Sequence, residues 1–179
     1  MLTRYISGRV YNYEYAIGRN ANAGAGFSHP VDFAVAPGGV LYVINKGNEF
    51  NPGMGLTKCT LDSEFIWEDR GLGFAGGNYT WPSSVAVDSG EQVYISDDYA
   101  SQINIYDKEG NHTGQWGTKG TGEGELNGPS GLDFDKDDNL HVVDALNNRV
   151  QVFTKDGKFL SGWGSQGTEE GQFNMPWGI

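Results

Sequence analysis

The acidic run Asp133–Asp138 is the stretch of this sequence that comes nearest to a metal-binding loop. Its first carboxylates alternate along the chain, and Asp144 stands where a calcium loop carries its closing acid, so oxygen ligands for Ca²⁺ occur in a suitable order. A calcium loop needs glycine where Asp138 stands, however, and a polar hairpin turn between two strands explains the same residues. The sequence therefore favours the turn, and we predict no metal and no cofactor.

Histidine, cysteine and glycine motifs offer no second route to catalysis. His29, His112 and His141 are widely separated and could hold zinc only if the fold brought them together, and the lone Cys59 has no second cysteine to act with. The sequence contains no G-x-S-x-G elbow, phosphate loop or H-E-x-x-H pattern. Because Gly120–Gly124 follows a predicted strand and opens no helix, we interpret it as a loop. We predict no catalytic residue.

The charge balance narrows the range of partners. The chain has 23 acidic and 12 basic residues, a formal net charge of −11, and no run of lysine or arginine that would form a basic patch. Since phosphate neutralisation drives most nucleic-acid affinity, nucleic acids and anionic membrane surfaces are disfavoured as partners. We therefore expect a protein or peptide ligand.

Hydropathy and the first residues bear on localisation. No apolar stretch approaches the ~18 residues of a membrane span, and the start of the chain lacks the basic and apolar regions of a signal peptide. We predict a soluble chain without a signal peptide or transmembrane segment, and leave its cellular compartment open.

The elements that position these residues belong to a repeat of 47 residues. Pro82, Pro129 and Pro176 follow one another at this interval. The same shift superimposes many further residues: Asp97 on Asp144, Tyr106 on Phe153, Trp116 on Trp163, Gly120 on Gly167 and Gly124 on Gly171. A period of this size indicates a solenoid, an array or a propeller.

The first full unit, residues 30–81, is five residues longer than the others. It returns to the common register at Leu56, so the added residues lie between Lys46 and Gly55, within Asn48–Gly53. Additions that a rigid scaffold does not need commonly carry recognition, which makes Phe50 a candidate binding residue.

Each unit contains four predicted strands joined by polar or glycine-containing turns. In the third unit these are residues 130–135, 140–143, 149–153 and 159–163. The second strand is apolar on nearly every residue, so both its faces must be covered, and His141 takes the place of Tyr42 and Tyr94 on it. Four short strands of this kind form one propeller blade, in which His141 is a packing residue.

The third unit resembles an NHL repeat. The similarity lies in Gly128–Leu132, Asn139–Asp144, Asn147–Phe153 and the entry to the next unit, Gly171–Pro176. It extends over Pro82 to Ile179, and over residues 30–81 with the insertion.

This resemblance implies an all-β fold, a β-propeller whose blades are sheets of four antiparallel strands. The units are a partial blade at 1–29, a repeat with an insertion at 30–81, repeats at 82–128 and 129–175, and the start of a further repeat at 176–179. Because the family's ring usually has six blades, the chain would form an incomplete arc of about four. It would then be part of a longer protein, or several chains would assemble into one ring.

Four polar residues follow the second strands and are interpreted as structural. Asp97 and Asp144 are expected to accept backbone N–H bonds of the following turn. Asn148 and Arg149 would support that turn in the third unit, where the second unit has Ser101-Gln102. The departure puts one turn interaction of the second unit in doubt without affecting the fold.

In propellers the loops between blades and the loops after the second strands emerge on one rim, the usual binding face. The residues expected there are His29, Phe50, Trp81, Tyr99, Leu146 and Trp177. They predict a non-catalytic scaffold that binds a protein or peptide through this rim, although Trp81 and Trp177 could instead fill gaps between blades. The alternative implied by the resemblance is an enzyme, similar to peptidyl-hydroxyglycine lyase or a metal-dependent lactonase. An enzyme would need converging ligands on the axis, where Val31, Ser83, Ser130 and Trp177 are expected.

Overall fold

The computed structural model describes residues 3–6, 9–12, 16–17, 27, 29–48, 51–69 and 81–179 of the chain. Fourteen strands lie in these ranges, together with a single turn of 3-10 helix, η1 (Ala145–Asn147). No helix in the described ranges is long and apolar enough to cross a membrane. The fold is therefore all-β, as the sequence predicts.

Twelve of the strands form three antiparallel sheets of four, each with its strands in chain order. Blade 1 consists of β3 (Pro30–Ala36), β4 (Val40–Asn48), β5 (Asn51–Thr60) and β6 (Phe65–Asp69). Blade 2 consists of β7 (Pro82–Val87), β8 (Val93–Asp97), β9 (Gln102–Tyr106) and β10 (His112–Trp116). Blade 3 consists of β11 (Pro129–Phe134), β12 (Leu140–Asp144), β13 (Arg149–Phe153) and β14 (Phe159–Trp163).

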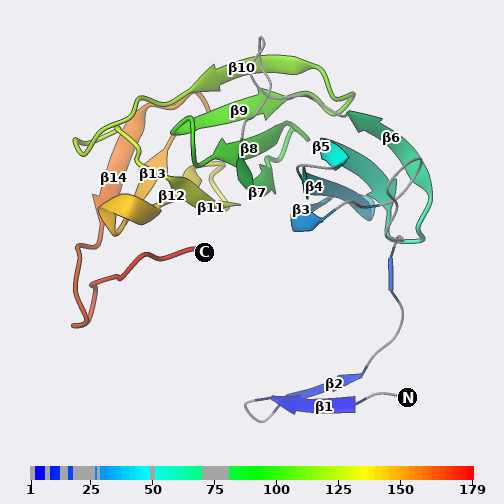
Figure 1. Cartoon of the computed structure of the whole chain (residues 1–179), viewed down its shortest axis with the longest axis horizontal. Coiled ribbons are helices and arrows are strands. Elements are labelled where there is room, and N and C mark those ends of the chain that lie inside the picture. Colours follow the sequence, from blue (N-terminus) through cyan, green and yellow to red (C-terminus); the bar gives the residue numbers. More distant parts are fainter. Residues whose placement is uncertain are drawn as a thin grey trace.

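The three blades fan out in an arc, with the first strands β3, β7 and β11 on its inner side and β6, β10 and β14 on its outer side (Figure 1). The remaining strands, β1 (Thr3–Ile6) and β2 (Arg9–Asn12), pair as a separate hairpin. Residues 176–179, expected to begin another strand, are not in a strand.

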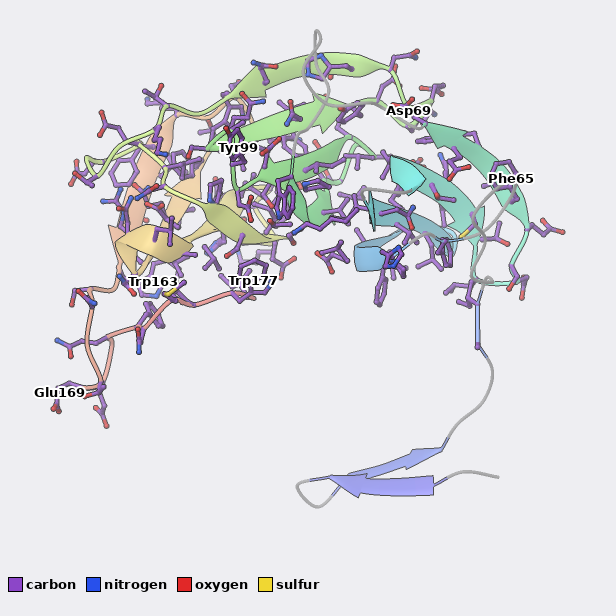
Figure 2. The ribbon with its side chains drawn as sticks, in the orientation of Figure 1. Phe65, Asp69, Tyr99, Trp163, Glu169 and Trp177 are labelled. Carbon is purple, nitrogen blue, oxygen red and sulfur yellow. The ribbon has the colours of Figure 1, made fainter. Side chains whose placement is uncertain are left out.

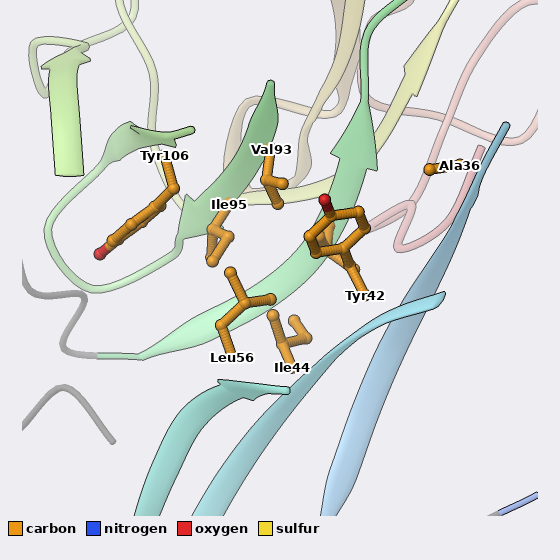
Figure 3. Close-up of a cluster of buried hydrophobic side chains, with 8 residues drawn as sticks. Ala36, Tyr42, Ile44, Leu56, Val93, Ile95 and Tyr106 are labelled. Carbon is orange, nitrogen blue, oxygen red and sulfur yellow. The ribbon is translucent and has the colours of Figure 1, made fainter. Parts of the chain in front are cut away.

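Packing between neighbouring blades forms the core, which explains why the second strands are apolar on both faces. Figure 3 shows the contact between blades 1 and 2, where Tyr42, Ile44 and Leu56 face Val93, Ile95 and Tyr106. The repeat produces the same layer between blades 2 and 3, where Tyr94 and Ile103 pack with Leu140, Val142 and Phe153. Each of these side chains is at most 2% exposed, and burying one large apolar side chain contributes about 1.5–3 kcal/mol.

The insertion in the first unit lengthens a hairpin. Strands β4 and β5 continue past the point where the equivalent strands of blade 2 end, with Lys46 opposite Met54 and Asn48 opposite Asn51. The extra residues therefore continue the ladder of blade 1, instead of forming the separate loop that their turn-forming composition indicates. Phe50 itself lies outside the described residues.

Aspartates organise the hairpin turns at the opposite ends of the blades. Asp88, Asp107 and Asp135 each accept backbone N–H bonds from the residues two and four positions later, over 2.8–3.0 Å. Hydrogen bonds from the Asn139 side chain and backbone hold the pKa of Asp135 well below its usual range. The acidic run of the sequence thus forms a turn before β12, whereas Asp144 lies at the far end of that strand. The turn and the closing acid of the calcium pattern are separated by the length of β12.

Candidate functional site

One rim of the arc brings together the loops that lead into the blades and the loops that follow their second strands. In each blade one backbone N–H, on the second strand or just after it, donates to the carbonyl of the entry residue: Lys46 to His29 at 3.1 Å, Asp98 to Trp81 at 3.2 Å and Ala145 to Gly128 at 3.3 Å. These three bonds occupy the same repeat position. We call this side of the molecule the entry rim.

A groove of about 550 Å³ opens on the entry rim between blades 2 and 3. We call it the rim groove. Three of the residues predicted for the binding rim, Tyr99, Leu146 and Trp177, lie in its wall. The rest of the wall is made by Asp98, Lys119, Asn127, Gly128, Ala145 and Met175. Figure 2 labels Tyr99, which comes from the loop after β8, and Trp177, which comes from the C-terminal segment.

Large apolar side chains in the groove wall are exposed. The exposed fractions are 71% for Tyr99, 53% for Leu146, 61% for Met175 and 57% for Trp177. Because the interfaces between blades bury side chains of this size almost completely, these four contribute little to the described core. Exposed aromatics and aliphatics on a rigid rim are suitable anchors for a partner.

The backbone fixes the position of Leu146. It lies in η1, and Asn148, in the left-handed conformation with φ of 55°, closes this turn by donating its backbone N–H to Ala145. Gly128 packs against the turn with φ of 62°, where an added Cβ would lie 3.0 Å from Leu146 Cγ. Glycine suits this position, because any other residue would need a left-handed backbone and a shift of the Leu146 side chain.

The carboxylate of Asp144 ties blade 3 to the loop that precedes it. Its side chain is fully buried. Oδ1 accepts the Asn127 backbone N–H at 2.6 Å, and Oδ2 accepts from the side chains of Asn147, Arg149 and Gln151 at 2.9, 2.8 and 3.1 Å. The predicted turn role of Asp144 is therefore incomplete, since its described partners lie on the preceding loop and on β13 as well as in the turn.

Arg149 extends this clamp to the loop 117–128. Its guanidinium donates to the carbonyls of Gly122 and Glu125 at 2.7 and 2.9 Å, and Asn147 donates to the carbonyl of Gly120 at 2.9 Å. Asn148, predicted to support its own turn, accepts the Met175 backbone N–H at 2.8 Å. Asn147 and Asn148, which are neighbours in one turn, thus position the two chain segments on either side of the rim groove.

The equivalent turn of blade 2 has different chemistry. Asp97 accepts the Ala100 backbone N–H at 2.9 Å, as expected for a turn-forming aspartate. Gln102 takes the place of Arg149, and its side chain bonds to Asn104 and Gln115. Asp98 stands where blade 3 has Ala145, so blade 2 places an additional carboxylate at the rim groove.

Charges on the blade 2 side of the groove are partly removed from water. Burial raises the pKa of Asp98, and the charge of Lys46 counteracts this effect. Burial also lowers the pKa of Lys46, which lies near both Asp97 and Asp98. The Lys46 ammonium is 4.9 Å from the centroid of the Trp81 ring, a cation–π contact.

The remaining predicted rim residues continue the surface toward blade 1. Trp81 is 52% exposed, and its Lys46 neighbour lies on β4 just before the inserted residues. His29 is exposed and has φ of 53°. Neither residue lines the rim groove.

Sequence reasoning missed Asp98, Lys119 and Met175 as groove residues. Met175 occupies the repeat position of Gly128, Trp81 and His29, so alignment of the entry positions could have identified it. Lys119 and Asp98 give no such signal, because their proximity depends on how the loop 117–128 packs against blade 2.

A second cavity, of about 440 Å³, lies among the first strands. Asp32 spans the inner ends of blades 1 and 2: its Oδ2 accepts the Ser84 hydroxyl at 2.5 Å and the Val85 backbone N–H at 3.0 Å. Ser84 in turn accepts the Leu132 backbone N–H at 3.1 Å. Val31, Ser83 and Trp177, expected on the axis, line this cavity, whereas Asp32 was missed. Among the residues that the structure describes, no three His, Cys, Asp or Glu side chains are grouped to hold a metal ion.

Comparisons of sequence give no family assignment. No protein-family profile matches the chain, and no curated protein matches it.

Comparison of structure gives many matches, and the three described below have at most 20% sequence identity to this chain. Virginiamycin B lyase from Staphylococcus aureus matches with a TM-score of 0.58 and 20% identity over 84% of this chain and 45% of that one. A nidogen–laminin complex matches at 0.53 and 17%, over 74% and 48%. Hydrazine synthase of Kuenenia stuttgartiensis matches at 0.59 and 13%, over 92% and 42%. The chain thus spans less than half the length of these structures. The likeness shows that its three sheets are blades of a β-propeller.

Proposed function

We propose that this chain is a non-catalytic propeller scaffold of the NHL type that binds a protein or peptide through its entry rim. The observation that carries the proposal is the rim groove, in which Tyr99, Leu146 and Trp177 are exposed around one hollow. The clamp of Asp144 and Arg149 holds this wall in place before any ligand binds, which reduces the entropic cost of binding. A six-bladed ring remains part of the proposal.

The structural neighbours are compatible with more than one function. One is a lyase and another is a protein complex, so the fold alone does not choose between catalysis and binding. The choice rests on the sites. The groove on the rim offers exposed apolar anchors, as peptide-binding surfaces do.

An enzyme acting on the axis is the second candidate, favoured by the polar cavity that contains Asp32. Its carboxylate already accepts two bonds that join blades 1 and 2. The described residues do not form a metal centre there, so we assign no catalytic step to this cavity. Turnover of a peptidyl-hydroxyglycine or lactone substrate that is lost in Asp32→Asn, with an unchanged melting temperature, would replace the binding proposal.

The test is selection of peptides from a random displayed library on the immobilised protein, followed by titration of the selected peptides. The double variant Tyr99→Ala/Leu146→Ala should weaken their binding at least about tenfold, since each truncation removes a large apolar contact. Leu160→Ala is the matched control, because Leu160 is a similarly exposed leucine on β14 and is not in the groove wall. Selected peptides that bind the double variant as well as the wild type would contradict the proposal.

A further inference from the structure

The wall of the rim groove is chemically asymmetric. Asp98 lies on its blade 2 side and Lys119 belongs to the loop that leads from blade 2 to blade 3, while the exposed apolar side chains of Tyr99, Leu146, Met175 and Trp177 complete the wall. A ligand that fills this groove must therefore match one carboxylate, one ammonium group and an apolar surface. This requirement restricts the ligand more than the shape of the groove does.

Blade 2 has an acidic residue, Asp98, at a repeat position where blade 3 does not. Both turns have a carboxylate at the preceding position, but Asp98 is replaced by Ala145 in blade 3. The Asp98 backbone N–H holds Trp81 in the same way as Ala145 holds Gly128, so this backbone bond does not depend on the carboxylate. The carboxylate accepts a bond from the Tyr99 backbone N–H, and blade 3 has no carboxylate at this position. A partly buried charge that only one of the two blades places in the groove wall is suited to recognition.

The local field at Asp98 favours a cation. Asp97 lies beside it, and the charge of Asp97 also raises the pKa of Asp98. Lys46 is the cation whose charge lowers the pKa of Asp98, and burial acts more strongly in the opposite direction. An incoming positive group would stabilise the ionised carboxylate, and the formal net charge of −11 would steer such a group toward the protein.

Lys119 favours one orientation of a ligand in the rim groove. Its side chain is exposed, and like charges repel, so a basic ligand group is disfavoured next to it and favoured next to Asp98. The apolar side chain of the same ligand would then contact Tyr99, Leu146 and Trp177.

We propose that the rim groove selects a peptide segment in which a basic side chain lies next to a large apolar one, the basic group pairing with Asp98 and the apolar group packing against Tyr99, Leu146 and Trp177. This inference rests on the proposed function, because it names the ligand chemistry of the same groove. It adds a specificity residue, Asp98, that a purely apolar anchor site would not need.

The experiment uses two fluorescent peptides that differ only in one charge, with cores Gly-Arg-Leu-Gly and Gly-Glu-Leu-Gly, acetylated and amidated at their ends. Fluorescence anisotropy should show at least about tenfold tighter binding of the arginine peptide to the wild type, as expected for a charge-assisted bond in a partly dry site. Asp98→Asn should weaken the arginine peptide about three- to tenfold and leave the glutamate peptide unchanged or improved. Asp156→Asn is the control, since it removes the same charge from an exposed turn of the other rim.

The outcomes separate this inference from the proposed function. If library-selected peptides lose affinity for Tyr99→Ala/Leu146→Ala but Asp98→Asn binds both charged peptides as the wild type does, the groove binds peptides and its proposed charge preference is wrong. Stronger binding of the glutamate peptide, or no binding of either charged peptide, would also overturn the preference. If the double variant changes the affinity of no peptide, both proposals fail together.

Discussion

The turns that follow β8 and β12 both end on a left-handed residue with φ of 55°, Ser101 and Asn148, and differ in what their side chains bind. Asp97 and Asp144 are both fully buried. The partners of Asp144 include the preceding loop and β13, while Asp97 accepts the Ala100 N–H of its own turn and lies near Lys46 of blade 1. The loop after β12 is therefore part of a neutral clamp, and the loop after β8 carries the acidic side of the rim groove. The buried aspartate is thus kept at one repeat position of both blades, while the residues next to it differ and give the two blades different surfaces at the rim groove.

Removing the hub of the clamp should have the largest effect on stability. In Asp144→Ala the Arg149 guanidinium and two side-chain amides lose their acceptor in a buried site, and breaking a buried ion pair costs about 3–5 kcal/mol. Chemical denaturation measures this loss. The matched variant Asp97→Ala should lose clearly less. Equal losses would mean that Asp97 stabilises blade 2 as strongly as the Asp144–Arg149 pair stabilises blade 3.

Gly128→Ala should have the next largest effect. The new side chain would need a left-handed backbone and would lie 3.0 Å from Leu146 Cγ, and strain of this kind costs about 1–3 kcal/mol. Gly114→Ala is the control, because nothing lies within 4 Å of an added Cβ there. Denaturation midpoints of the two variants should differ, and the affinity of groove peptides should fall only in Gly128→Ala. Identical midpoints would show that the entry turn adapts to a side chain.

The rim opposite the groove should make the protein acid-sensitive. Lys155 of blade 3 lies 3.1 Å from Asp88 and 2.9 Å from Asp138, and Asp138 also accepts bonds from the Ser89 hydroxyl and backbone N–H. The Ser89 hydroxyl, followed by Lys155, lowers the pKa of Asp138 from 3.8 to about 2. Because the folded-state pKa lies below the unfolded one, this stabilisation is complete above about pH 4 and is lost as the pH falls toward about 2.

Melting temperatures recorded through this range test the acid sensitivity. Asp138→Asn should flatten the decrease, whereas Asp137→Asn, which removes a more exposed carboxylate of the same turn, should not. A decrease of the same size in Asp138→Asn would assign it to other carboxylates. Lys155 also links two blades, so its replacement is unsuitable as a neutral control for binding experiments.

Much of the fold could be predicted from the sequence because the repeat supplies independent copies of the same signal. The strands expected in the third unit agree with β11–β14 to within one residue at each end. The course of the inserted hairpin could not be predicted, because no other unit contains a counterpart whose register could be compared. Strand pairing past Asn45 consists of backbone bonds between β4 and β5. The turn-forming residues of the insertion do not indicate this pairing.

The candidate site was predictable in part for the same reason. Tyr99 and Leu146 share one repeat position, so their place on one rim followed from the fold. The clamp on the loop 117–128 was missed because its bonds join residues 24 to 27 positions apart. The acceptors are backbone carbonyls, which every residue has, so the sequence of the loop does not indicate them. The same is true of Asp98, which is near Lys46 of blade 1 and is joined to Trp81 by a backbone bond.

The smallest expected effect, and the most direct test of the comparison, comes from giving blade 2 the arginine of blade 3. Gln102→Arg places a guanidinium one strand position after the turn, where Arg149 reaches Asp144 at 2.8 Å. A partly exposed ion pair contributes less than about 1 kcal/mol, so the melting temperature should change little. The added charge should nevertheless reduce the negative potential at Asp98 and weaken binding of the arginine peptide about threefold, an effect that salt should diminish.

Ser161→Arg, on the exposed face of β14, is the control for this prediction, because it adds the same charge away from the groove and should leave the affinity for the arginine peptide unchanged. Equal affinities for the two variants would show that the charge difference between the turns does not govern recognition, and a large gain in stability from Gln102→Arg would show that blade 2 had lacked a clamp.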